Sequence, residues 1–183
     1  MLKSEEIRER ADKILRDTGL LAELAKYGDV HPIGSYRMDI MAWNDIDIDV
    51  RNDTISLEKL YALTRYVLDV FHPVWYEAKE KVTDEGKTVW FHGWEAVIDG
   101  ELWNFDIWFF DEETITKAEA FCDGISAKLA AEPEKKALIA QIKRELIGRG
   151  MYSFEQFCSM DVYRAVLELG MTSADEMIRD YAK

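Results

Sequence analysis

The 183-residue sequence has few residues of the kinds that cross-link or anchor a protein, with two cysteines and three histidines. Cys122 and Cys158 lie far apart and outside any Cys-x-x-Cys spacing, so they indicate neither a disulfide framework nor a zinc site. No run approaches the roughly 18 apolar residues of a membrane span, and the opening MLKSEEIRERADKIL lacks the apolar stretch of a secretion signal. We therefore expect reduced thiols, a cytoplasmic location and no membrane partner.

Basic residues are also scarce, because 23 lysines and arginines face 36 aspartates and glutamates, which gives a net charge of -13. Such a field repels phosphate backbones and attracts cations, which argues against a long nucleic acid as partner. A small cationic substrate or a basic protein fits this field, and so does a surface that is acidic only for solubility. The hydrophobic content of 48% is ordinary for a globular chain of one domain.

Hydrophobic periodicity predicts helices and strands in an order that fits an α+β or α/β fold. Helices are predicted at 4–18, 56–71, 114–131 and 134–147, and strands at 45–50, 74–82, 88–98 and 101–110. Two further helix starts are expected where Ser153/Gln156 and Ser173/Glu176 have the spacing of capping boxes. The fold class is then a small mixed sheet with helices packed on it, followed by a helical C-terminal third.

The segment Asp45-Ile46-Asp47-Ile48-Asp49-Val50 alternates between acidic and apolar residues with period two. Side chains alternate across a strand, so the apolar residues would face the core and the three aspartates would share the other face. Like charges at this spacing repel one another unless a cation or basic group lies among them. This strand therefore predicts a bound cation or a basic partner.

A second acidic residue is placed by the Asp99-Gly100 pair, which is typical of a two-residue type I′ hairpin. Pairing of Ile98 with Glu101 across this turn puts Asp106 opposite Gly93 and Asn104 opposite Glu95. Glycine within a strand often marks a bulge or close approach, so we expect open space beside Asp106.

Gly34-Ser35, a gap of nine residues, Asp45-Ile46-Asp47 and a later strand with Asp106 together resemble the nucleotidyltransferase superfamily typified by DNA polymerase beta. The resemblance covers roughly residues 29–110, and PIGSYRMDIMAWNDIDIDV is its most specific part. Within the superfamily this segment is similar to small bacterial lincosamide and aminoglycoside nucleotidyltransferases and to minimal transferases that serve as antitoxins. The resemblance implies a nucleotidyltransferase core at 1–112, with the helical region 113–183 packed on it.

The resemblance also implies a role for each motif residue. Asp45, Asp47 and Asp106 would hold two Mg²⁺ ions, with Mn²⁺ as a substitute, and Asp106 would help to deprotonate an acceptor hydroxyl. Hard oxygen ligands suit Mg²⁺, and two ions about 4 Å apart stabilise phosphoryl-type transfers. Gly34 and Ser35 would hold the phosphates of a nucleoside triphosphate such as ATP, since glycine lets backbone amides approach a phosphate closely. Arg37 would neutralise the leaving pyrophosphate.

The function so implied is magnesium-dependent transfer of a nucleoside monophosphate to a hydroxyl of a small acceptor, for which a cationic antibiotic is the concrete example. The alternatives are a noncatalytic, antitoxin-like module that binds a protein, and a cation site without nucleotide. Asp47 and Asp49 also satisfy the Asp-x-Asp pattern and form an alternative metal pair. An apolar stripe in the last third is expected to pack on its own domain, with a homodimer contact as the alternative; it consists of Phe154, Phe157, Val162, Val166 and Leu169.

Overall fold

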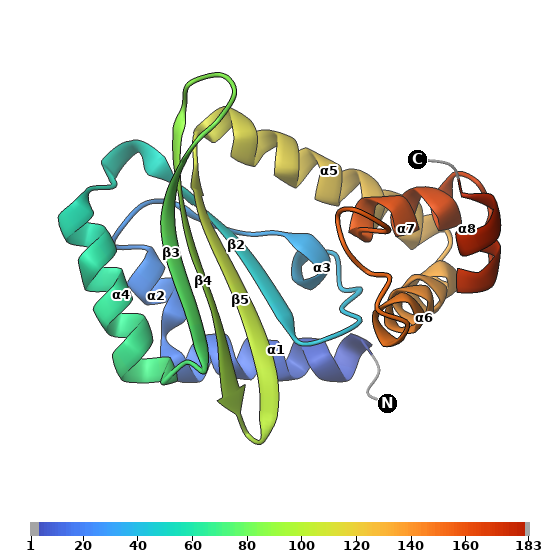
Figure 1. Ribbon diagram of the computed structural model, residues 1–183, viewed down its shortest axis with the longest axis horizontal. Coiled ribbons are helices and arrows are strands. Elements are labelled where there is room, and N and C mark those ends of the chain that lie inside the picture. The colour runs from blue at the N-terminus through green and yellow to red at the C-terminus, as the bar shows by residue number, and fades with distance from the viewer. Residues whose placement is uncertain (1–3, 182–183) are drawn as a thin grey trace.

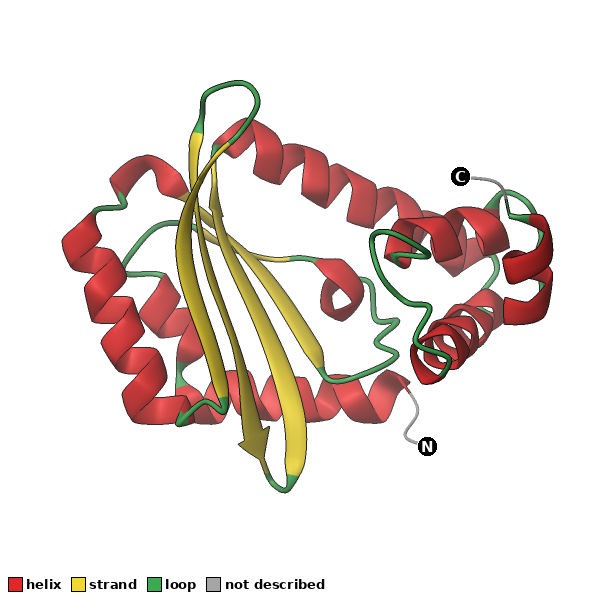
Figure 2. Cartoon of the chain, in the orientation of Figure 1, coloured by secondary structure: helices red, strands yellow, loops and turns green. Residues whose placement is uncertain are grey.

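The computed structural model describes residues 4–181, which form eight α-helices, one short 3-10 helix and five strands (Figures 1 and 2). In chain order these are α1 (Ser4–Thr18), α2 (Leu20–Leu24), β1 (Val30–Pro32), α3 (Gly34–Arg37), β2 (Asp45–Arg51), η1 (Asn52–Thr54), α4 (Leu57–Phe71), β3 (Trp75–Val82), β4 (Thr88–Ile98), β5 (Glu101–Phe110), α5 (Glu112–Ala131), α6 (Glu134–Gly148), α7 (Ser159–Leu167) and α8 (Ala174–Asp180). No helix among the described residues is both long and apolar enough to cross a bilayer.

The five strands form one mixed sheet in the order β1-β2-β5-β4-β3. β2 and β5 are parallel, and the other pairs are antiparallel. The predicted α+β fold with a small mixed sheet is therefore confirmed. The hairpin register is also as predicted, since Ile98 pairs with Glu101 and both Asp99 and Gly100 have the positive φ that a type I′ turn requires.

One face of the sheet is covered by α1, α2 and α4, which lie beside it in Figure 1. Ile46, Ile48 and Val50 of β2 point into this interface and are fully buried. The alternation of β2 thus places its apolar residues in the core, and its aspartates project from the opposite face. That opposite face is where a functional site can form.

A second apolar cluster joins α5 to α8 with Met38 and Ile40, which follow α3. Helix α5 starts at the end of β5 and leads away from the sheet to α6, α7 and α8 (Figure 1). Met38 and Ile40 therefore anchor the helical third directly behind the segment that carries Gly34 and Ser35.

The predicted helix start at Ser153/Gln156 is wrong. Ser153 Oγ does accept a hydrogen bond from the Gln156 amide at 3.1 Å, but the segment closes a loop through a bridge between Tyr152 and Phe157. Helix α7 begins at Ser159, where the Asp161 carboxylate accepts from the Cys158 amide at 2.9 Å. A serine side chain stabilises a single turn as well as it caps a helix, so the spacing alone does not distinguish the two. The Ser173 cap of α8 is confirmed.

The residues of the predicted apolar stripe in the last third do not share one buried face. Val162 and Val166 are buried in the second cluster, whereas Phe154 is 90% exposed and Leu169 is 52% exposed. Phe154 lies in the loop before α7, outside the helix to which the stripe assigned it.

A row of hydrogen-bonded polar side chains on the core side of the sheet makes the stability of the protein depend on pH. His92 Nδ1 lies 3.0 Å from the Tyr76 hydroxyl, which lies 2.7 Å from the Thr64 hydroxyl. Burial lowers the pKa of His92 to about 4. The unfolded chain therefore binds a proton at a higher pH than the folded chain, and stability falls as the pH drops below about 6.5.

We expect the wild type to lose about 2 kcal/mol more unfolding free energy than His92→Gln between pH 7 and pH 5. Glutamine keeps an amide for Tyr76 and does not titrate. Urea unfolding of both proteins at the two pH values measures the difference, and equal losses would show that His92 carries no such effect.

Candidate active site

Asp45 and Asp47 of β2 and Asp106 of β5 come together on the open face of the sheet. Asp47 and Asp106 are register partners across the parallel strand pair, and Asp45 precedes them by one pleat. Each offers one carboxylate oxygen, and these oxygens all lie within 4.8 Å of one another. Within residues 4–181 this is the one group of three acidic, histidine or cysteine side chains that meets that distance. The arrangement brings together the three aspartates that the sequence singled out.

The electrostatics of this group fit a divalent cation. Burial, opposed by a hydrogen bond from the Asn104 amide at 2.8 Å, raises the pKa of Asp45 to about 6. Burial together with the charges of Asp45 and Asp106 raises the pKa of Asp47 well above its ordinary value. Magnesium prefers oxygen ligands such as these three carboxylates. The like charges of the carboxylates repel one another, and a bound cation would relieve that repulsion.

Gly34 and Ser35 form the start of α3, immediately beside Asp47. Gly34 has φ of 64°, and a Cβ at this position would overlap the Asp47 carboxylate. The Ile33 amide donates to the Asp47 carbonyl at 3.0 Å, which ties the start of α3 to β2. Only glycine permits this combination of left-handed backbone and close approach to the acidic group. The structure thus places Gly34 and the buried Ser35 next to the aspartates.

Arg37 contacts two acidic residues of α5. Its guanidinium contacts Glu119 at 2.9 Å and Asp123 at 3.0 Å. These two ion pairs link α3 to α5. The role of Arg37 toward a leaving pyrophosphate stays a prediction, and it requires the guanidinium to exchange these partners.

Asp49, the third aspartate of β2, does not join the group. It is 1% exposed, neither of its oxygens has a hydrogen-bond partner among the described residues, and burial raises its pKa to about 7. Its register partner is His31 of β1, on the side of β2 away from Asp106. The alternative metal pair of Asp47 and Asp49 is therefore not assembled with a third ligand in this structure.

Lys143 of α6 lies near the acidic group and was missed by sequence reasoning. It is 2% exposed and donates to the Tyr163 hydroxyl at 2.7 Å. Burial lowers its pKa to about 8, while the charges of Asp45 and Asp47 oppose this shift. A usable signal was present, because Lys143 occupies an apolar helical stripe with Ile139 and Leu146.

A cleft of about 670 Å³ opens on the other side of the acidic group. Asp47 and Asp106 line the edge nearest β2, strands β3 to β5 form its floor, and Phe154 lines it from the loop before α7. The open space predicted beside Asp106 is not present at Gly93 itself. A Cβ on Gly93 would overlap the Phe91 ring and lie 3.2 Å from the Trp75 ring, so these aromatic rings occupy that space.

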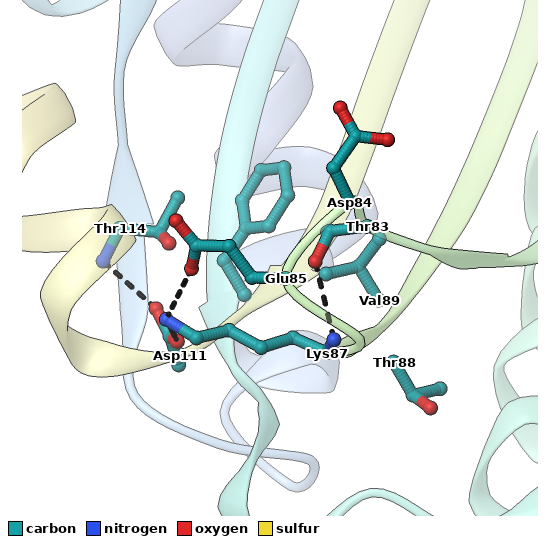
Figure 3. A pocket seen from close by; sticks show the side chains of 9 residues that line it. Thr83, Asp84, Glu85, Lys87, Thr88, Val89, Asp111 and Thr114 are labelled. Atoms are coloured by element: carbon teal, nitrogen blue, oxygen red, sulfur yellow. Dashed lines mark hydrogen bonds and ion pairs between the residues drawn. The ribbon is translucent and has the colours of Figure 1, made fainter.

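A separate hollow of about 440 Å³ lies between the β3–β4 hairpin and the start of α5 (Figure 3). Lys87 reaches across it to Asp111 at 2.6 Å, and Asp111 accepts from the Thr114 amide at 2.8 Å. These contacts hold the hairpin against the first turn of α5. None of the three clustered aspartates lines this hollow.

No protein-family model matches the chain, and no curated protein matches its sequence. Among solved structures, a cytoplasmic RNA terminal U-transferase is 16% identical, with a TM-score of 0.56 over 90% of this chain and 48% of that chain. The Cid1 poly(U) polymerase with bound MgGTP is 17% identical, with a TM-score of 0.56 over 90% of this chain and 50% of the other. Terminal uridylyl transferase 4 from Trypanosoma brucei with bound UPU is 16% identical, with a TM-score of 0.53 over 88% and 53%.

The chain thus spans about half the length of the solved structures it matches. At this identity the likeness establishes the fold, which is the nucleotidyltransferase fold that the sequence motifs predicted. The resemblance to the smaller lincosamide and aminoglycoside subgroup stays a prediction.

Proposed function

We propose that this chain, which has the nucleotidyltransferase fold, is a magnesium-dependent nucleotidyltransferase that moves a nucleoside monophosphate from a nucleoside triphosphate to an acceptor hydroxyl. The observation that carries the proposal is the meeting of Asp45, Asp47 and Asp106 beside the Gly34 backbone. In the reaction a bond forms between the acceptor oxygen and the α-phosphorus, and the bond from that phosphorus to the bridging oxygen breaks. Pyrophosphate takes the electron pair and leaves.

Asp45, Asp47 and Asp106 would hold the magnesium, with two ions expected and Mn²⁺ as a substitute. When bound, the metal neutralises phosphate charge and polarises the reacting oxygens. Asp106 faces the cleft and lies at the edge of the group nearest β4, where it can accept the proton of an acceptor hydroxyl. Burial raises the pKa of Asp106 above its ordinary value, which brings it closer to the neutral range suited to a general base.

The triphosphate would lie on the side of β2 away from this cleft, between α3 and α6. Gly34 and Ser35 border the acidic group there, and Lys143 is close enough for its charge to act on Asp45 and Asp47. A lysine buried in an apolar helix face costs stability unless its charge is compensated. Two carboxylates and an incoming triphosphate supply that compensation, and we assign Lys143 to the phosphates.

The acceptor is proposed to be a small molecule. The cleft beside Asp106, at about 670 Å³, lies within the range of small-ligand sites. The net charge of -13 was the reason to expect a cationic, antibiotic-like acceptor. The matched structures are named for poly(U) and RNA terminal transfer, so an RNA end is the second candidate acceptor for the same site.

The proposal is tested by thermal unfolding with each nucleoside triphosphate, with and without magnesium, on the wild type and Asp45→Asn. Ligand at about 100 times its Kd adds roughly 2.7 kcal/mol, which corresponds to a Tm increase of about 5–10 °C for a chain of this size. We expect this increase to need magnesium and to disappear in Asp45→Asn.

The two alternatives predict different results in the same experiment. A noncatalytic, antitoxin-like module would show no nucleotide-dependent increase. A simple cation site would show a magnesium effect that nucleotide leaves unchanged. Either outcome would overturn the proposed transferase.

A further inference from the structure

The acidic group separates two environments. On the β1 and β2 side, Gly34 and Lys143 approach Asp45 and Asp47. On the β5 side, the cleft begins at Asp106 and continues over β4 and β3. Figure 1 shows α3 and α6 on one side of β2, with β5, β4 and β3 on the other. Because the first side takes the triphosphate in the proposed function, the second side is left for the acceptor.

The floor of the cleft is aromatic beyond Asp106. Trp108 lies two residues along β5, and its ring centroid is 4.5 Å from that of Phe91 on the neighbouring strand. Phe110 stacks on Trp108 with an interplanar angle of 7° and a centroid distance of 5.2 Å. Trp75 is 43% exposed and shares a row with Glu95 and Asn104, on the other side of Asp106 from Trp108. Trp108 and Phe110 are partly exposed, whereas Phe91 is buried. Partly exposed rings on an open sheet face offer a stacking surface for a planar group.

Two lysines lie over these rings. Lys79 Nζ is 5.2 Å from the Phe91 centroid, and Lys81 Nζ is 5.4 Å from the Trp108 centroid. Glu77 contacts Lys79 at 2.8 Å and partly offsets its charge. Lys81 is exposed and forms no salt bridge with a carboxylate within the described chain. The far end of the cleft is therefore locally basic in a protein of strongly negative net charge.

The strand registers order these groups along the cleft. Asp106 shares its row with Gly93 and Glu77, Trp108 shares the next row with Lys79, and Lys81 lies one row further. Successive rows on one face of a strand are roughly 7 Å apart. A hydroxyl at Asp106, a ring on Trp108 and an anion at the lysines thus follow one another in a single direction.

We infer that this cleft binds the acceptor and that the acceptor is a nucleotide, in which a planar ring and a phosphate accompany the reacting hydroxyl. The inference rests on the proposed function for the identity of the reaction. The ring stacks on Trp108, and the phosphate contacts Lys79 and Lys81. A free mononucleotide and the end of a short RNA share this chemistry. A polycationic aminoglycoside does not match this chemistry, because Lys79 and Lys81 would repel its ammonium groups.

The inference is tested by calorimetric binding of two probes, adenosine 5′-monophosphate and a 5′-phosphorylated trinucleotide of uridine, with the donor site filled by a nonhydrolysable triphosphate and magnesium. The variants are Trp108→Leu and the pair Lys79→Gln/Lys81→Gln. We expect each to weaken probe binding about tenfold. Trp108→Phe retains a ring and should restore most of the affinity, which also guards against a folding defect in the leucine variant.

Matched controls exist for both changes. Trp43 is 39% exposed and Lys117 is an exposed lysine of α5, and neither lines the cleft. Trp43→Leu and Lys117→Gln should bind both probes as the wild type does. A preference for the mononucleotide would identify a small acceptor, and a preference for the trinucleotide an RNA end, and both support the nucleotide chemistry.

Three results would overturn the inference. These are probe binding that the cleft variants leave unchanged, competition between probe and triphosphate for one site, and tighter binding of an aminoglycoside that depends on Glu77 or Glu95. Magnesium-dependent triphosphate binding is measured separately on the same proteins. Its loss would overturn the proposed reaction, whereas its persistence with no probe binding would overturn the acceptor site alone.

Discussion

Replacement of Asp47 by asparagine is expected to reduce nucleotidyl transfer by about 1000-fold or more, and at the same time to stabilise the metal-free protein. Asp47 contributes an oxygen to the carboxylate group and is the member with the most acidic neighbours. A metal contributes several kcal/mol to the transition state, and each 1.36 kcal/mol is a factor of ten in rate. The measurement is steady-state release of pyrophosphate with magnesium and triphosphate.

The stability gain follows from the sign of the pKa shift. Folding raises the pKa of Asp47, which means that the folded protein disfavours the charged carboxylate. At a pH above the ordinary pKa of an aspartate, this charge therefore favours the unfolded state. Asparagine has nearly the same shape and removes that cost. Without magnesium, the Tm of Asp47→Asn should therefore exceed that of the wild type at pH 8, and the difference should shrink as the pH falls and Asp47 takes up a proton.

Asp49→Asn is the matched control, because Asp49 lies on the same strand, is buried and also has a raised pKa. Its oxygens lie outside the acidic group, so the variant should gain stability and keep turnover. Loss of turnover in Asp49→Asn with retention in Asp45→Asn would instead support Asp47 and Asp49 as the metal pair. The comparison thus distinguishes an aspartate that binds the metal from one that is buried and binds no metal.

The parts of the site that the sequence predicted are those fixed by local periodicity. Period-two alternation assigns Ile46, Ile48 and Val50 to the core and the aspartates to the other face, whatever the rest of the chain does. The Asp99-Gly100 turn sets the register of β4 with β5, and that register carries Asp106 to Gly93. The family resemblance grouped Asp106 with Asp45 and Asp47, whereas the parallel pairing of β2 with β5 that brings Asp106 to Asp47 was not predicted.

The parts that the sequence did not predict depend on contacts between distant segments. Phe154 belongs to a stripe that reads as helical, yet a local serine turn keeps it in a loop facing the cleft. Arg37 follows the Gly34-Ser35 pair, yet two acidic residues of α5, more than 80 positions away, hold its guanidinium. Neither partner can be identified from the residues around the motif.

The net charge gave a similarly incomplete guide to the acceptor. A value of -13 describes the average field around the molecule, whereas the cleft combines carboxylates at one end with Lys79 and Lys81 at the other. Binding selectivity depends on the groups within a few ångströms, because exposed charges beyond about 10 Å are screened in ordinary buffers. The local arrangement therefore outweighs the average.

Lys143→Met is expected to weaken binding of magnesium and triphosphate about 10- to 100-fold, the equivalent of one hydrogen bond between charged groups. Methionine matches the length of the lysine stem and fills the buried position among Ile139, Ile142 and Leu146. The Tyr163 hydroxyl loses its donor, so a small change in Tm is expected as well. Lys135→Met is the control, because Lys135 lies on the same helix and pairs locally with Glu132 at 2.7 Å.

The pH dependence of this binding distinguishes a phosphate ligand from a structural lysine. Burial lowers the pKa of Lys143 to about 8 in the free protein, and a bound triphosphate would favour the protonated form. Affinity for the triphosphate should therefore fall as the pH rises from 7 to 9 in the wild type, while Lys143→Met shows a flatter profile over the same range. Titration calorimetry at several pH values measures both, and parallel profiles would assign Lys143 to the packing of α6 against Tyr163, with no part in holding the phosphates.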